Sequence, residues 1–142
     1  MFAVCALAYT LLGLFFGGFQ HLFEQLTAAA TDAKRLQGQS SSAWGIAILR
    51  GCLLVPIFEE VLFRGLLLSW LNRHMRFTFA LIAMSALFAA MHVYPVALPY
   101  TFLFGIVTGY VRRLTGSTAN TVVIHVLNNI VLLALGLHFF GH

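Results

Sequence analysis

Apolar runs of membrane-spanning length dominate this sequence and limit what the chain can fold into. Hydrophobic residues make up 61% of the 142 positions, and charged residues only 8%. A helix needs about 20 apolar residues to cross a bilayer, and runs near this length cover residues 2–18, 51–70, 77–93, 98–111 and 119–140. We therefore predict an all-α membrane protein, a bundle of about five transmembrane helices with a polar site near the midplane.

Residues 20–42 differ from the rest of the chain because they combine charged residues with apolar residues at helical spacing. This pattern is typical of an amphipathic helix in the membrane interface, and the Gly- and Ser-containing residues 38–42 indicate a flexible linker. We predict that residues 1–42 form the first transmembrane helix and this interfacial segment with its linker. Residues 43–142 then form the helical core that carries the site.

The formal net charge of +4 indicates topology rather than a nucleic-acid partner, since the basic residues are scattered over helix ends and loops. The predicted helices place two arginine-bearing turns on one side of the membrane. Cytoplasmic loops carry an excess of Lys and Arg, so these turns are predicted to face the cytoplasm. The arginines of the two turns are Arg73, Arg76, Arg112 and Arg113.

Two carboxylates and a guanidinium interrupt the apolar run of residues 51–70. A charge at the centre of a bilayer costs roughly 2.5–3.5 kcal/mol on insertion scales, so such residues indicate a functional site. Glu60 and Arg64 are four residues apart with the acid first, the favourable order for an ion pair on one helix face. Pro56 cannot donate a backbone hydrogen bond, and a kink is predicted just before the carboxylates.

Glu59 is rotated about 100° from Glu60 on the helix and has no partner nearby in sequence, which suits a general base. Other predicted helices supply His92, and His125 with Asn129 four residues later. The His125 and Asn129 side chains can donate to a developing oxyanion, and His92 can orient a water molecule. We place three further polar residues outside this site: Asn128, His138 and His142.

Three motifs follow one another along the chain: Glu-Glu-x-x-x-Arg at 59–64, Phe-x-x-x-His at 88–92 and His-x-x-x-Asn at 125–129. In their order and their placement on successive helices, they resemble the CAAX protease and bacteriocin-processing family of intramembrane proteases. This family includes the type II CAAX prenyl endopeptidases and the Abi-type membrane proteins. The resemblance covers roughly residues 50–135 and implies a multi-pass protein, which we expect in the bacterial cytoplasmic membrane.

The resemblance implies an endopeptidase that hydrolyses a peptide bond of a small membrane-associated protein or peptide, lipidated in the eukaryotic branch of the family. Glu59 would activate water, His92 would assist, and His125 with Asn129 would stabilise the oxyanion. Glu60 and Arg64 would hold the helix geometry. Family members usually have more than five spans, so the substrate groove can be incomplete in this chain.

The role of a metal is left open by the sequence. The family is commonly labelled as metalloproteases, but the chain has no His-Glu-x-x-His pair on one helix. Glu59, His92 and His125 could bind zinc or another divalent metal with one open position. A metal-free glutamate mechanism uses the same residues, and we favour it.

Two non-protease alternatives compete with this hypothesis. A membrane scaffold or a bacteriocin self-immunity protein would keep the polar residues as a packed network without catalysis. A small transporter or proton relay is less consistent with the sequence, because it shows no internal repeat and alternating-access folds commonly have paired halves. Substitution of Glu59 by Gln separates the first alternative from the protease.

Overall fold

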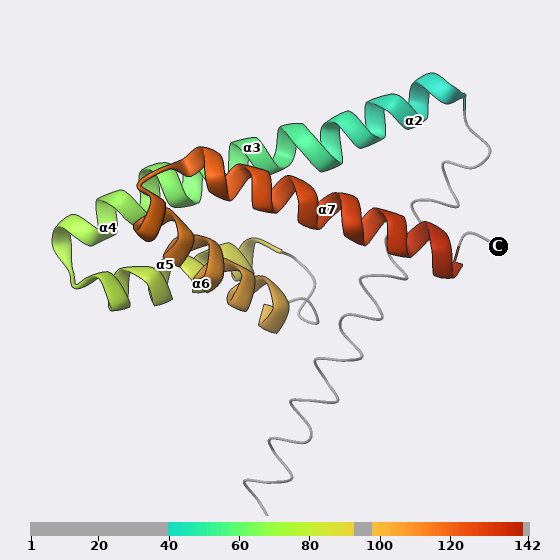
Figure 1. Ribbon diagram of the computed structural model, residues 1–142. Coiled ribbons are helices and arrows are strands. Elements are labelled where there is room, and N and C mark those ends of the chain that lie inside the picture. Colours follow the sequence, from blue (N-terminus) through green and yellow to red (C-terminus); the bar gives the residue numbers. More distant parts are fainter. Residues whose placement is uncertain (1–39, 93–97, 141–142) are drawn as a thin grey trace, which may run out of the picture.

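The computed structural model describes residues 40–92 and 98–140, and this part of the chain is helical almost throughout (Figure 1). It contains no strand in these residues, which confirms the predicted all-α class. The predicted first transmembrane helix and most of the interfacial segment lie outside the described residues. The elements are α2 (Ser41–Ile48), η1 (Leu49–Leu54), α3 (Val55–Glu60), η2 (Val61–Leu67), α4 (Leu68–His74), α5 (Phe77–Met91), α6 (Leu98–Thr115) and α7 (Thr118–Phe140).

The first five elements follow one another without a break and form one long helical run (Figure 1). Two π-helical segments, η1 and η2, lie on either side of α3. Pro56 stands in the first turn of α3, and the preceding Val55 N–H donates to the carbonyl of Arg50, five residues back. The backbone therefore accommodates the proline with a widened turn before the carboxylates. Such turns occur frequently at functional sites.

The observed helix ends differ in part from the predicted ones. The long run continues to His74, four residues beyond the predicted end at residue 70, so the turn before α5 consists only of Met75 and Arg76. Helix α6 extends to Thr115, four residues beyond its predicted end, and closes with Gly116 at φ 67°. The Gly116 N–H donates to the carbonyl of Arg112, a left-handed cap that glycine adopts without steric cost.

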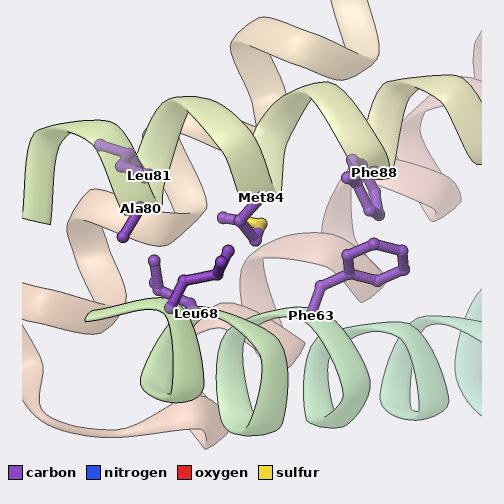
Figure 2. Close-up of a cluster of buried hydrophobic side chains, with 7 residues drawn as sticks. Phe63, Leu68, Ala80, Leu81, Met84 and Phe88 are labelled. Atoms are coloured by element: carbon purple, nitrogen blue, oxygen red, sulfur yellow. The ribbon is translucent and has the colours of Figure 1, made fainter. Parts of the chain in front are cut away.

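The core of the bundle forms where α5 packs against η2 and α4 (Figure 2). The rings of Phe63 and Phe88 meet edge to face, with centroids 5.1 Å apart, an arrangement that aromatic pairs prefer. Figure 2 shows Met84 of α5 between this pair and Leu68, and Met84 is completely buried. This contact fixes how the helix that carries the carboxylates lies against α5.

Helices α5 and α6 pack closely at two glycines of α6. The spacing of Gly105 and Gly109 predicts a face of small residues suited to close packing. A Cβ atom added to Gly105 would lie 2.9 Å from Cβ of Ser85, and one added to Gly109 would lie within 3 Å of the Leu81 and Met84 side chains. The predicted close-packing face is therefore confirmed.

The outer surface of the described helices is apolar, and large side chains such as Phe58, Met91 and Leu114 are mostly exposed. Soluble monomers rarely expose large apolar patches, so this surface is consistent with lipid contact. Within residues 40–92 and 98–140, one helix is long and apolar enough by itself to cross a membrane, over Thr118–Leu135, and Phe77–Met91 is a shorter apolar helix. The count of five spans stays a prediction.

Candidate active site

Glu60 is the centre of a buried polar network. Its Oε1 atom lies 2.9 Å from Nη1 of Arg64 and 2.9 Å from Nδ1 of His125, and the Glu60 and Arg64 side chains are 0% exposed. The predicted Glu60–Arg64 ion pair is therefore present. The sequence did not predict that Glu60 also binds His125 of α7, 65 positions away. Glu60 thus joins the long helical run to the last helix.

Arg64 extends this network into the other helices. Its Nη2 donates to the Thr108 hydroxyl at 2.6 Å, and the hydroxyl in turn donates to the backbone carbonyl of Phe104. The guanidinium carbon also lies 4.2 Å from the ring centroid of Phe88, within the range of a cation–π contact. Contacts from α5 and α6 therefore hold Arg64, which in turn holds Glu60.

His125 lies between the two carboxylates. Because the Glu60 oxygen can only accept, the geometry assigns the proton to Nδ1 of His125, and Nε2 then faces Glu59 at 3.6 Å from its Oε2. This separation exceeds a direct hydrogen bond, but one water molecule can contact both atoms. The edge-to-face contact with Phe104, at 4.9 Å between ring centroids, fixes the plane of the imidazole.

Glu59 differs from Glu60 because its side chain is 25% exposed and lines a groove of about 490 Å³. This volume lies within the range of small-molecule binding sites. Apolar side chains of η1, α3 and η2 form most of the groove wall, and His92 at the end of α5 lines it with Glu59. Nδ1 of His92 lies 2.8 Å from the Phe88 carbonyl. Since a carbonyl only accepts, Nδ1 carries the proton and Nε2 of the neutral ring is an acceptor.

Asn129 belongs to a chain of hydrogen bonds that links three helical segments. Its amide donates to the carbonyl of Gly51 in η1 at 3.1 Å, and its own oxygen accepts from the Asn128 amide at 3.4 Å. Tyr100 of α6 in turn donates to the Asn128 oxygen. Asn128 was predicted to lie outside the site, and Tyr100 was not among the predicted site residues. The only available signal was a second amide and a phenol within apolar helices.

The predicted metal ligands are not gathered around one point. Among the residues that the structure describes, no three His, Cys, Asp or Glu side chains lie close enough together to hold a metal ion. Glu59 contacts His125, while His92 is bound to the backbone of its own helix. The arrangement therefore does not fit a zinc site made of Glu59, His92 and His125.

Glu59 and His92 line an apolar groove, and the buried network of Glu60, Arg64 and His125 lies directly behind Glu59. Residues 41–131 match the family model described as type II CAAX prenyl endopeptidase Rce1-like. The chain belongs to this family of membrane proteases, which confirms the resemblance based on the three motifs. The matched range includes every predicted catalytic residue. No curated protein and no solved structure matches the chain.

Proposed function

We propose that this chain is an intramembrane endopeptidase in which Glu59 is the general base. The observation that supports this most directly is the difference between two adjacent carboxylates. Glu60 is fully buried and paired with Arg64 and His125, whereas Glu59 is partly exposed and lines the groove. Of these two carboxylates, only Glu59 can therefore contact a substrate and a water molecule in the groove.

In this mechanism the Glu59 carboxylate removes a proton from a water molecule held between it and His125. The water oxygen bonds to the carbonyl carbon of the peptide, and the carbonyl electron pair moves onto its oxygen. Glu59 then passes the proton to the departing amide nitrogen as the carbon–nitrogen bond breaks. The products are a new carboxyl terminus and a new amino terminus.

The oxyanion that forms in the first step needs hydrogen-bond donors. Asn129 uses one of its two amide hydrogens on the Gly51 carbonyl, and the second remains for the substrate. His125 can donate to the oxyanion through Nε2 only when both of its ring nitrogens carry a proton, and this Nε2 atom lies 3.6 Å from Oε2 of Glu59. Nε2 of His92 would accept from the attacking water and orient it.

The groove suggests an apolar substrate segment. Side chains of Leu54, Phe58 and Leu62 line it, and Arg50 is its only cationic lining residue. Such a surface suits an extended apolar peptide or a lipid chain attached to one, and it limits the access of bulk water. We therefore propose a small membrane-associated protein or peptide as the substrate, with lipidation as one form of it.

The experiment compares membranes that contain wild type, Glu59→Gln or the control Asn120→Ala, whose residue is exposed at the start of α7. Mass spectrometry of peptide termini identifies cleavage products. We expect products with wild type and the control, and their loss with Glu59→Gln. Persistence of the products in a chelator-treated wild-type sample would support the metal-free mechanism, and their loss would favour a metal.

The buried network also supports a second candidate, a scaffold or self-immunity protein. Arg64 and Glu60 connect η2 and α3 with helices α6 and α7, and this would stabilise the bundle without any catalysis. Under this alternative, well-folded wild type and Glu59→Gln give identical sets of peptide termini. Arg64→Ala would still lose the fold, so only the Glu59 variant separates the two candidates.

A further inference from the structure

A second, polar pocket lies where helices α4 and α6 end. It has a volume of about 330 Å³, and its lining includes the side chains of Arg73, Arg112 and Arg113 together with Ser69 and Asn72. The buried Arg64 borders it from the inside. Arg64 is held by Glu60 and Thr108. It therefore lies between this pocket, which it lines, and the candidate active site, to which Glu60 belongs.

Arg64 is paired with Glu60, but the other three arginines that line this pocket have no carboxylate partner among the described residues. In the described part of the chain the only acidic residues are Glu59 and Glu60, and the ion pairs there do not include Arg73, Arg112 or Arg113. The Nε atom of Arg112 is buried and has no hydrogen-bond partner in the structure. Three guanidinium groups thus share one pocket in which the described residues supply no carboxylate to balance them.

The Arg113 side chain is held in place by a contact with another helix. Its guanidinium carbon lies 4.1 Å from the ring centroid of Phe77 at the start of α5. Stacking of this kind holds a guanidinium by its face and leaves the N–H groups at its edge to bind a ligand. The pocket is therefore built from the ends of α4 and α6 and the beginning of α5.

We propose that this pocket binds the phosphate group of an anionic membrane phospholipid. Arginine donates in pairs to phosphate oxygens, and basic pockets between membrane helices on the cytoplasmic side bind anionic headgroups. The pocket lies at helix ends, beside the turns that the charge distribution assigns to the cytoplasm. This inference depends on the membrane setting of the family and not on the proposed peptidase mechanism.

The test is native mass spectrometry of the full chain in detergent, titrated with phosphatidylglycerol or with phosphatidylcholine. An arginine near a membrane surface contributes about 1 kcal/mol to the binding of an anionic headgroup, or about fivefold in affinity. We expect wild type to retain phosphatidylglycerol preferentially. Arg73→Gln should bind it about fivefold more weakly, and Arg73→Gln/Arg112→Gln about 25-fold more weakly.

Arg76→Gln is the matched control, because Arg76 is an exposed arginine between α4 and α5, three residues after Arg73, and does not line the pocket. It should bind the lipid as wild type does. Because Arg73 is exposed, Arg73→Gln should fold normally. Its lipid binding can therefore be measured even where the loss of Arg112 impairs folding of the double variant. Equal retention of the two lipids, or unchanged binding in Arg73→Gln, would overturn the proposal. Complete displacement of the lipid by millimolar inorganic phosphate would overturn the lipid assignment in favour of free phosphate.

Discussion

The same substitution at two adjacent positions should have different effects in this protein. Glu59→Gln and Glu60→Gln each replace a carboxylate by an amide of nearly the same shape. Glu60 is 0% exposed and lies 2.9 Å from both Arg64 and His125, whereas Glu59 is 25% exposed and has one partner at 3.6 Å. We expect Glu60→Gln to lower stability strongly, and Glu59→Gln to leave stability unchanged while it removes activity.

The size of the difference follows from burial. Removal of the Glu60 charge leaves the Arg64 guanidinium buried without a carboxylate, and breaking a buried pair in this way costs about 3–5 kcal/mol. The Glu59 contact is partly exposed and longer, and such pairs contribute about 0–1 kcal/mol. For a chain of this size the Glu60 variant should lose roughly 10 °C or more in apparent melting temperature.

The assay is thermal denaturation of the detergent-solubilised variants, followed by size-exclusion chromatography of the protein that stays in solution. A third variant, Glu60→Gln/Arg64→Met, removes both buried charges and should be more stable than Glu60→Gln alone, because no uncompensated guanidinium remains. The comparison isolates the electrostatic cause from a general intolerance of substitution at this depth.

Three results would refute this reasoning. Wild-type stability of Glu60→Gln would show that the buried pair does not hold the bundle together. An equal loss of stability in Glu59→Gln would show that the two carboxylates are not distinguished by burial. Equal stability of Glu60→Gln and the double variant would remove the unpaired Arg64 charge as the cause.

Two further predictions concern packing and the amide chain. Gly105→Ala should lower the free energy of unfolding by about 1–3 kcal/mol, because the new Cβ would lie 2.9 Å from Cβ of Ser85. Gly45→Ala should instead raise it by about 0.5–1 kcal/mol, because a Cβ atom there has nothing within 4 Å. Melting curves of both variants measure these changes. Tyr100→Phe removes the donor to Asn128 and should cost about 0.5–1.5 kcal/mol. In a peptidase assay it should lower kcat more than it changes KM, and an unchanged kcat would remove this hydrogen-bond chain from the site.

Much of the fold and part of the site could be predicted from local spacing. The alternation of apolar runs with polar turns predicted where the helices lie. The observed starts of α5, α6 and α7 are within one residue of the predicted positions. The Glu60–Arg64 pair follows from a separation of four residues on one helix, which any helical conformation brings together. The three motifs were sufficient to indicate the family, because each consists of residues close together in sequence, along one helical run or, for His92, directly after the end of α5.

The contacts between helices were decided only by the tertiary structure. The position of His125 between Glu59 and Glu60 depends on how α7 is rotated and how deep it lies against α3, and neither is encoded in the spacing along one helix. The same holds for the link from Tyr100 to Asn128. The rotation of each helix is determined by side-chain packing, such as the Phe63–Phe88 contact. Sequence therefore determined which polar groups the chain carries within apolar helices, and packing decided which of them meet.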